Sequence, residues 1–421
     1  MIAKSDSRAL VARWPDAWLL GGIRTPFVDF AQAASLVSPI DLGIKAAREA
    51  FSRVGASPGD ADTVIAGSMA QASFDAYLLP RHIGLYAGVP VEVPAHLVQR
   101  VCGTGIEVIS QAADATAQDR ADLALCVGTE SMSRNPVAAY THRTGFRMGQ
   151  VEFRDFLWEA LLDTAVDTTM GGTAETLAKR FDISRAAVDQ FASRSFERAL
   201  AAQSSGYLEG EICALRDESF EVDGFKARGI KLRGNGSGVA ADTHVRSSSV
   251  EQLAKLKPAF GGVQTGGNSS AIVDGAAAVL VGSSRYLKER KLEPLARLVA
   301  SAAIGVHPGS MGLGPVGAIQ ALLKETGLRI ADIDRFEINE AFAAQVLACV
   351  RQMDLDESRL NVNGGAIALG HPLGATGIRL TLTLARELQR SRLRYGIASA
   401  CIGGGQGIAL LIENASPGAR A

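Results

Sequence analysis

The 421-residue sequence predicts an α/β fold, because short apolar segments with strand character alternate with longer segments of helical periodicity. Most of the strand candidates are apolar on both faces, as in a sheet that helices cover on both sides. A glycine-flanked turn followed by a helix and a strand that ends in glycine occurs at residues 101–128 and again at 370–405. This similarity favours a fold of two related halves.

The predicted strands are short apolar runs, several of them bounded by glycine. They lie at residues 63–67, 121–128, 276–282, 336–341, 395–403 and 407–413. In the predicted helices, apolar residues return every three or four positions. These helices cover residues 40–55, 106–118 and 183–203, and a further helix follows Gly377.

The middle of the chain differs in character from the rest. Residues 132–270 are rich in Arg, Thr, Ser and Gly, which predicts an inserted loop domain. Residues 1–131 and 271–293 then form an N-terminal half, and residues 294–421 form a C-terminal half. A chain of this length is sufficient for two core-bearing units and a smaller insertion.

Composition and charge exclude several classes of protein. With 43 Lys and Arg against 44 Asp and Glu, the chain has no overall basic field to attract nucleic acid or a membrane surface. No apolar run reaches the roughly 18 residues that a transmembrane helix requires. The first segment contains Asp6 and Asp16 and lacks a continuous apolar core, so it does not resemble a secretory signal. We therefore expect a cytoplasmic protein.

The five cysteines are Cys102, Cys126, Cys213, Cys349 and Cys401. They form no C-x-x-C pair and no Cys/His cluster with zinc-site spacing, so we expect neither a disulfide framework nor a metal site. Cys126 and Cys349 lie in apolar patterns and are predicted to be core residues, whereas the sequence leaves Cys213 undecided.

Cys102 is a candidate nucleophile. It lies between a strand-like segment and an amphipathic helix, where Gly103 and Gly105 permit a tight turn. A thiol at the N-terminus of a helix meets unpaired N–H groups and the positive end of the helix dipole, which favours the thiolate. The alternative is a buried structural cysteine, the usual fate of a free cysteine.

His371 and Asn339 are candidate polar partners. Five glycines crowd around His371, which indicates a backbone that passes close to something else. An imidazole held there could deprotonate a thiol or bind an oxyanion, although a turn histidine with satisfied hydrogen bonds is the alternative. Asn339 lies at a predicted strand-to-helix junction, where it could cap the helix and also face the crevice at the strand ends.

Cys401 precedes three consecutive glycines in CIGGGQG. This run resembles a phosphate-binding turn, but a strand-like segment follows it, and no Walker lysine is present. A nucleotide-binding module is therefore disfavoured. A glycine turn whose N–H groups stabilise an oxyanion is the better interpretation.

Together, these segments resemble the thiolase family. VCGTG (101–105), NEAFA (339–343), GHPLGATG (370–377) and CIGGGQG (401–407) follow the family's patterns in the family's order. Further segments in register include IRTPF (23–27), GTESMS (128–133) and TGGNSSAIVDGAAA (265–278). The resemblance implies a five-layered αβαβα fold of two similar halves, with a loop domain inserted in the first half.

The resemblance also implies roles for the candidate residues. Cys102 would take the acyl group as a thioester after His371 accepts its proton, and Cys401 would exchange a proton with the α-carbon of acetyl-CoA. His371 and a water held by Asn339 would form one oxyanion hole, and the N–H groups of Cys102 and Gly403 would form another. The reaction would cleave a 3-ketoacyl-CoA, or run in reverse as a Claisen condensation.

Coenzyme A and acetyl-CoA would be substrates, with no permanently bound cofactor. Arg246 and Ser270 match the family's adenine-stacking arginine and its serine near pantetheine, and a homodimer or homotetramer is expected. Thr169 stands where biosynthetic members carry a histidine, so longer or branched acyl chains could be accepted. Other condensing enzymes of the superfamily lack the second reactive cysteine in C-x-G-G-G. A catalytically silent homologue remains an alternative, although all four reactive residues are present.

Overall fold

The computed structural model describes residues 8–70, 73–140, 142–234 and 238–416. Within them, eleven strands form one large sheet. These strands are β1 (Leu10–Arg13), β2 (Trp18–Arg24), β3 (Val28–Asp29), β4 (Thr63–Gly67), β5 (Ala95–Val98), β6 (Leu123–Ser131), β13 (Val273–Gly282), β14 (Ala296–Gly305), β15 (Arg335–Ile338), β16 (Tyr395–Ile402) and β17 (Gln406–Asn414).

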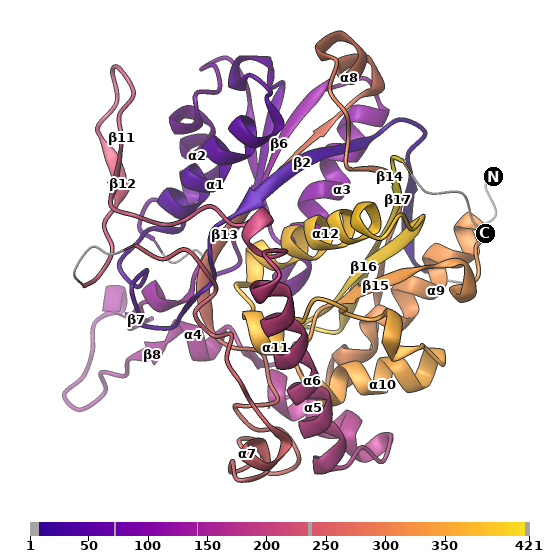
Figure 1. Ribbon diagram of the computed structural model, residues 1–421. Helices are drawn as coiled ribbons and strands as arrows, with labels where there is room; N and C mark the ends of the chain where they lie inside the picture. Colours follow the sequence, from indigo (N-terminus) through magenta and orange to yellow (C-terminus); the bar gives the residue numbers. More distant parts are fainter. Residues whose placement is uncertain (1–7, 71–72, 141, 235–237, 417–421) are drawn as a thin grey trace.

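The strand order is β15-β16-β17-β14-β2-β13-β6-β4-β5, with β1 beside β14 and β3 beside β13. The helices that cover this sheet are α1 (Pro39–Val54), α2 (Leu79–Ala87), α3 (Thr104–Ala117), α8 (Ser284–Arg290), α9 (Gly314–Thr326), α10 (Ala343–Met353), α11 (Ala366–Leu369) and α12 (Leu373–Arg390). Figure 1 shows their arrangement around the strands.

The two halves of the chain repeat one order of elements. The first half runs β2, α1, β4, α3, β6 and β13, and the second runs β14, α9, β15, α12, β16 and β17. The pairs β4–β6 and β15–β16 are parallel, and the pairs that follow them in each half, β6–β13–β2 and β16–β17–β14, are antiparallel. The first half has one further parallel pair, β4–β5, at its edge. β2 and β14 join the halves as antiparallel neighbours. The internal duplication predicted from the glycine-rich turns is therefore confirmed at the level of topology.

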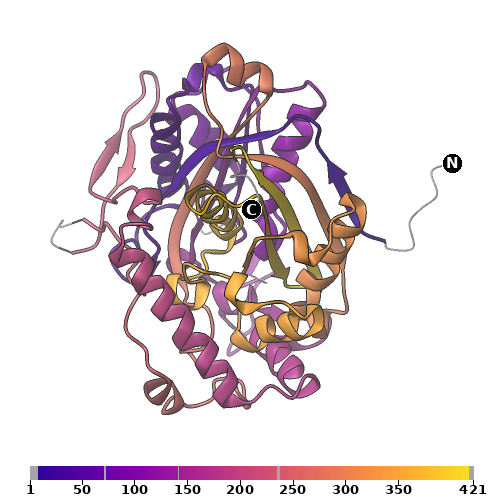
Figure 2. The same ribbon diagram turned by 45° about the vertical axis from the view of Figure 1, so that its right-hand side comes forward.

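The helices and the two half-sheets form five layers. α1 and α2 pack on the outer face of the first half-sheet, and α9 and α10 lie on the outer side of the second. Between the half-sheets, α3 and α12 share one apolar cluster with strands of both halves. Figure 2 shows α12 nearly end-on in the middle of the molecule. Every residue of β6 and β13 is buried, which confirms the prediction of strands covered on both faces.

The two central helices approach each other closely at a pair of glycines. A Cβ on Gly105 would lie 2.8 Å from the backbone nitrogen of Gly377, and a Cβ on Gly377 would lie 2.3 Å from the nitrogen of Ile106. Because no side chain could occupy either space, the first turns of α3 and α12 pack backbone against backbone. This contact brings the N-terminal ends of both helices, and the residues that precede them, to one place.

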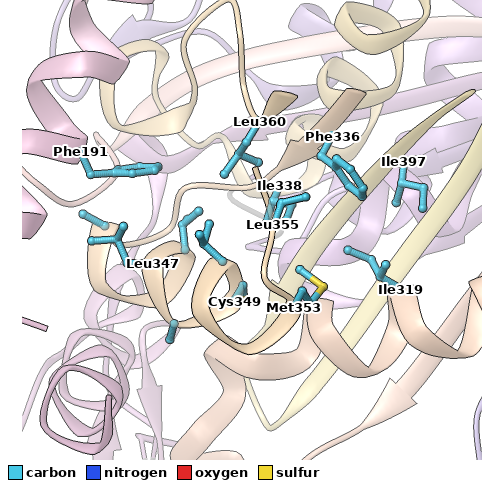
Figure 3. Packing of buried hydrophobic residues seen from close by; sticks show 14 of the residues in the cluster. Phe191, Ile319, Phe336, Ile338, Leu347, Cys349, Met353, Leu355, Leu360 and Ile397 are labelled. Carbon is cyan, nitrogen blue, oxygen red and sulfur yellow. The ribbon is translucent and has the colours of Figure 1, made fainter. Parts of the chain in front are cut away.

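The outer apolar cluster of the second half is shown in Figure 3. It combines β15 and β16 with α9 and α10, and Cys349 of α10 is fully buried within it. Cys126 is fully buried in the central cluster. Both cysteines are therefore core residues, as the apolar patterns predicted. Cys213 is also buried, with its Sγ 3.3 Å from the carbonyl oxygen of Arg24.

The segment between β6 and β13 contains short helices and two-stranded ribbons. Its elements are β7 (Val137–Ala138), β8 (Arg154–Asp155), α4 (Phe156–Glu159), β9 (Leu162–Asp163), β10 (Thr168–Thr169), α5 (Met170–Arg180), α6 (Arg185–Ser204), β11 (Glu218–Phe220), β12 (Arg228–Ile230) and α7 (Val250–Ala254). α5 packs against α10, and α6 packs against both α10 and α11. The domain limits at residues 131, 270 and 293 stay a prediction.

The sequence analysis did not predict β2, β5, β14 or α9. β2 contains Gly21 and Gly22, and β14 includes Arg297 and Ser301, so neither shows a plain apolar run. Their conformation depends on pairing with distant strands: β14 pairs with β17, β1 and β2. Such long-range pairing decides strand formation more strongly than local propensity does.

Candidate active site

Cys102 lies in the single 3₁₀ turn η3 (Val101–Gly103) that leads into α3. Val101 has a φ of 45°, an uncommon left-handed conformation for a β-branched residue that costs about 1–3 kcal/mol. Thr104 holds this turn: its Oγ1 accepts a hydrogen bond from the Arg100 N–H at 2.9 Å and donates to the Val101 carbonyl at 2.7 Å. The strained turn fixes the direction of the Cys102 thiol.

Burial raises the pKa of the Cys102 thiol to about 11, although the N–H groups of Gly403 and of Cys102 itself oppose this shift. The sequence analysis expected the helix N-terminus to favour the thiolate. That expectation is wrong for the resting site, because the loss of hydration outweighs the hydrogen bonds and the helix end. The thiol must therefore lose its proton to a nearby base when it reacts.

Cys401 lies near the end of β16, directly before the tight turn to β17. A second strand, and not a helix, follows the glycines, which agrees with the argument against a nucleotide-binding turn. The oxyanion-binding role of this turn stays a prediction. The Gly403 N–H lies against the Cys102 thiol. Burial, followed by the neighbouring Cys102 and Cys349 thiols, raises the pKa of Cys401 well above its usual value. In the resting site Cys401 is therefore a neutral thiol.

His371 precedes α12, after Gly370, whose φ is 100°. A Cβ on Gly370 would lie 2.5 Å from a methyl group of Val273, so this position requires glycine. The side chain of His371 contacts two polar groups: its Nδ1 lies 2.6 Å from Thr376 Oγ1, and its Nε2 lies 3.3 Å from Asn339 Nδ2. The close-packed backbone predicted from the glycines around His371 is therefore present.

These contacts define the tautomer of His371. Thr376 Oγ1 donates to the Pro372 carbonyl at 3.3 Å, so it accepts the Nδ1–H of His371. Nε2 then carries a lone pair, toward which the Asn339 amide N–H points. Burial lowers the pKa of His371 to about 3, with the positive charge of Arg379 as a second cause. His371 is thus a neutral imidazole whose Nε2 lone pair can accept a proton.

Asn339 immediately follows β15 and is fully buried. The proposed role as a helix cap is wrong, because α10 begins only at Ala343, with Phe342 at its N-cap position. The Oδ1 of Asn339 has no hydrogen-bond partner among the described residues. A buried amide oxygen in this state suits the binding of a water or of a polar substrate group.

An apolar cavity of about 420 Å³ adjoins these residues. His371 and Ser270 line it directly. Cys102 belongs to one apolar cluster with Met132, Leu157 and Leu373 of its wall, and the cluster that contains Cys401 packs against Met170 and Phe342. His371 and Ser270 therefore face the cavity, both thiols lie in apolar clusters that share residues with its wall, and Asn339 contacts the imidazole.

Arg246 lies apart from the residues that line this cavity. Its guanidinium carbon is 4.9 Å from the ring centroid of Phe196, and its Nη1 is 2.8 Å from Nε2 of His244. His244 in turn contacts Asp29 through Nδ1 at 2.6 Å. The roles of Arg246 and Ser270 in CoA binding stay predictions.

Sequence reasoning missed two polar residues that support the site. Thr376 lies within the GHPLGATG segment, whose spacing could have indicated it. Glu130 is fully buried: its carboxylate accepts hydrogen bonds from the N–H groups of Met69, Ala70 and Gly374, and from Ser68 Oγ, at 2.9–3.0 Å. It ties the start of α12 to the loop after β4, a contact that no local pattern predicts.

In the described part of the chain, no helix is long and apolar enough to cross a membrane. In the same residues, no cluster of three or more His, Cys, Asp or Glu side chains could hold a metal ion.

Residues 18–285 match the family described as "Thiolase, N-terminal domain", and residues 292–414 match "Thiolase, C-terminal domain". The chain is 41% identical over 401 residues to the mitochondrial 3-ketoacyl-CoA thiolase of Bos taurus, which covers 94% of this chain and 98% of that protein. It is 38% identical to beta-ketothiolase BktB of Cupriavidus necator, in an alignment that covers 94% of this chain and 98% of that protein.

Among solved structures, human mitochondrial 3-ketoacyl-CoA thiolase in complex with CoA superimposes with a TM-score of 0.89 at 40% identity. That alignment covers 97% of this chain and 100% of the human chain. The shared fold, the near-complete coverage and the two family matches agree with one another. The chain therefore belongs to the thiolase family, whose reaction is the CoA-dependent cleavage of 3-ketoacyl-CoA or the reverse condensation.

Proposed function

We propose that this protein carries out the thiolase reaction by ping-pong chemistry through an acyl thioester on Cys102. The meeting of two buried thiols, the Gly403 N–H and the Asn339–His371 pair beside one apolar pocket supports this proposal. Each chemical step requires a group of this kind at that place.

In the first half of cleavage, His371 Nε2 takes the proton of the Cys102 thiol as the sulfur attacks the 3-keto carbon. The bond between C2 and C3 breaks, and the acyl group from C3 onward stays on Cys102. The electron pair of the broken bond remains on the acetyl-CoA enolate, and Cys401 protonates its C2. A neutral thiol is the form of Cys401 that this step needs, which agrees with its raised pKa.

In the second half, the Cys401 thiolate takes the proton of a free CoA thiol, whose sulfur attacks the Cys102 thioester. The bond between the acyl carbon and the Cys102 sulfur breaks, His371 returns its proton to Cys102, and the shortened acyl-CoA is released. The N–H groups of Cys102 and Gly403 would bind the oxyanion of the acyl-Cys102 intermediate, and His371 with an Asn339-bound water would bind the enolate oxygen. Backbone donors fixed in a dry pocket stabilise such charges strongly. In the reverse direction, the same groups would perform the Claisen condensation.

We also propose that the pocket accepts 3-ketoacyl chains longer than acetoacetyl. Thr169 lines the cavity, and its hydroxyl accepts the Gly172 N–H at 3.1 Å as the N-cap of α5. Its polar atom is therefore already bonded, and a threonine is smaller than the histidine of biosynthetic members. Apolar residues such as Leu157, Leu161 and Trp158 continue this wall.

CoA-dependent cleavage of 3-ketoacyl-CoA substrates of increasing chain length tests both proposals. Cys102→Ala should abolish activity and acyl-enzyme formation, as detected by intact mass, whereas Cys401→Ala should lose turnover but retain acylation by acyl-CoA. Cys126→Ala, at a buried cysteine in β6 outside the site, is the matched control and should remain active. Wild type that binds CoA but cleaves no chain length would indicate a silent homologue.

A cytoplasmic location and a homodimeric or homotetrameric assembly belong to the same proposal. All five cysteines are free thiols, which suits a reducing compartment. The mass of the native particle in solution would test the assembly, and localisation of the tagged full chain would test the compartment.

A further inference from the structure

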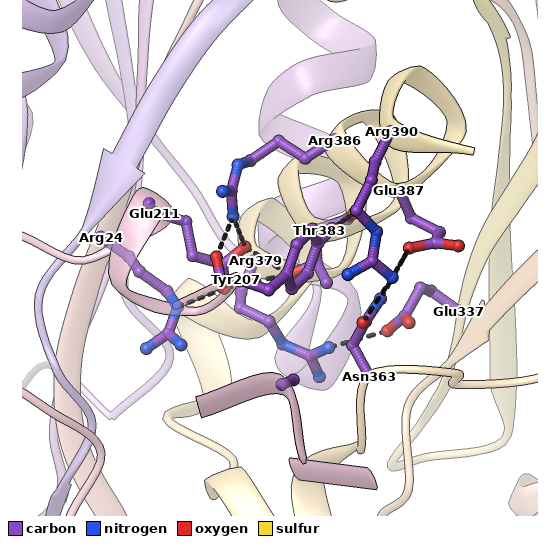
Figure 4. Close-up of polar contacts among 12 residues, drawn as sticks. Arg24, Tyr207, Glu211, Glu337, Asn363, Arg379, Thr383, Arg386, Glu387 and Arg390 are labelled. Carbon is purple, nitrogen blue, oxygen red and sulfur yellow. Dashed lines mark hydrogen bonds and ion pairs between the residues drawn. The ribbon is translucent and has the colours of Figure 1, made fainter. Parts of the chain in front are cut away.

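A buried arginine lies in α12, two turns beyond His371. Arg379 is completely buried, and its Nη1 donates a hydrogen bond to Oε2 of Glu337 at 2.8 Å. Glu337 is 2% exposed and belongs to β15. Figure 4 shows this pair beside the contacts of Glu211 with Arg24 and Arg386.

Stability alone explains this pair poorly. Burial raises the pKa of Glu337 to about 8 despite the opposing charge of Arg379. Burial of an ion costs several kcal/mol, so apolar side chains of similar volume often serve a fold equally well. The Nε and Nη2 of Arg379 have no hydrogen-bond partner in the described residues, which adds to the cost of its burial. A costly charge this close to a reactive site is a candidate for a functional role.

The position of the pair suggests what that role is. Glu337 lies two residues before Asn339 on one continuous segment, and Arg379 follows His371 on α12. The pair therefore joins the two elements whose ends carry the 3.3 Å contact between Asn339 and His371. A shift of α12 along β15 would separate these two side chains directly.

We propose that the Arg379–Glu337 pair is a positioning device that locks α12 to β15 and thereby holds His371 and Asn339 in register for the reaction. This inference rests on the proposed function. Neither residue touches the pocket, so both act through the two residues that they align.

The charge of Arg379 has a second effect on the imidazole. It adds to burial in lowering the pKa of His371, so His371 stays neutral and able to accept a proton. The other titratable groups around the site are the thiols of Cys102 in η3 and Cys401 in β16, and the buried carboxylates of Glu130 in β6 and Glu340 after β15. Of the charged groups, Arg379 is the one that acts on His371.

The protein contains its own control for this idea. Arg335, at the start of β15, pairs with Glu387 near the end of α12 at 3.3 Å. This second ion pair joins the same two elements, but it lies at their ends distant from the site, and the Arg335 side chain is 25% exposed. Loss of Arg335 tests whether any contact between β15 and α12 would suffice.

The experiment compares Arg379→Met, Arg379→Lys, Glu337→Gln and the control Arg335→Met with wild type. Thiolytic kcat and KM are measured from pH 5 to 9 at matched folded fraction. Arg379→Met should lower kcat about 10- to 100-fold, the usual loss from misaligned reacting groups, with KM for CoA within about twofold of wild type. In wild type the acidic limb of the pH–rate profile lies below pH 5, because the pKa of His371 is about 3. In Arg379→Met this limb should move up into the measured range, because the imidazole has lost a neighbouring positive charge.

Arg379→Lys keeps the charge, but its shorter side chain places the ammonium short of the Nη1 position that bonds Glu337, so kcat should fall while the acidic limb stays in place. Glu337→Gln retains an acceptor for Nη1 of Arg379, so it should lose less activity than Arg379→Met. Because Arg379 keeps its charge, the acidic limb of the pH–rate profile should not move to higher pH. Arg335→Met should stay within about twofold of wild type. If Arg379→Met does not fold, the Lys and Gln variants decide the question.

Wild-type kcat in Arg379→Lys, or an equal loss in Arg335→Met, would overturn the inference. A lower kcat in Arg379→Met without movement of the acidic limb would refute the effect of Arg379 on the pKa of His371. The alignment of His371 with Asn339 by the pair would still stand. Wild type that cleaves no 3-ketoacyl-CoA would instead refute the proposed function, so the two failures are distinguishable.

Discussion

The hydrogen bond between Thr376 and His371 offers the sharpest single test of the site. Thr376→Val replaces the hydroxyl by a methyl group of similar size in a fully buried position. The Nδ1–H of His371 then loses its acceptor, which lies at 2.6 Å in the native site. An unsatisfied buried donor costs about 1–3 kcal/mol.

The imidazole can relieve that cost by moving its proton to Nε2, which removes the lone pair needed to activate Cys102. In either case the transition state loses about 1–3 kcal/mol relative to wild type. This corresponds to a loss of about 5- to 150-fold in kcat/KM. Thr376→Ser, which keeps a hydroxyl, should restore most of the activity.

The assay is the rate of Cys102 acylation by acyl-CoA under single-turnover conditions, followed by intact mass. Thr381→Val is the matched control, because Thr381 is also fully buried on α12 and its hydroxyl bonds only the Gly377 carbonyl, at 2.9 Å. Acylation by Thr376→Val within twofold of wild type, at equal folded fraction, would refute the assigned tautomer. Equal losses in both valine variants would show that the effect comes from general loosening of the helix.

Three more predictions follow from the same geometry. Gly105→Ala should lower the free energy of unfolding by about 1–3 kcal/mol in chemical denaturation, because the new Cβ would clash with the backbone of α12. Gly305→Ala is the control: its new Cβ would have its nearest neighbour at 4.0 Å, so the free energy of unfolding should change little. The rate of wild-type acylation should vary little between pH 5 and 8, because the pKa of His371 lies near 3. In His371→Ala the rate should rise about tenfold per pH unit toward the Cys102 pKa of about 11, because only the thiolate then reacts. A flat profile in that variant would show that another base acts. Thr169→His should lower kcat/KM for long chains relative to acetoacetyl-CoA by about 10- to 200-fold, and an unchanged ratio would show that Thr169 does not limit the acyl pocket.

Much of the site was visible in the sequence because its chemistry needs particular residue types in particular local settings. A cysteine before a helix, a histidine among glycines and a cysteine before a glycine turn are local patterns, and each indicated its residue. The glycines at 105 and 377 also mark the close contact of α3 and α12. Local steric requirements of this kind leave a direct record in residue identity.

The protonation states of the site were not predictable in the same way. The helix-end argument indicated a thiolate at Cys102, but burial outweighs it and keeps the thiol neutral. The pKa of a group depends on every element that removes water from it, and for Cys102 those elements include β16 and the wall around Met132 and Leu157. The assignment of Asn339 as a helix cap failed because α10 starts three residues later than the pattern suggested.

The sequence by itself determined the class of fold, its duplication, the family and the candidate reactive side chains, because periodicity, glycine placement and motif order are all local properties of the chain. Only the tertiary structure decided which polar groups support those side chains. The Glu130 contact with Gly374 joins residues 244 positions apart, and the Arg379–Glu337 pair joins residues 42 positions apart. Such contacts arise from the packing of distant elements, and their hydrogen bonds and charges act only once the fold has brought them together and excluded water.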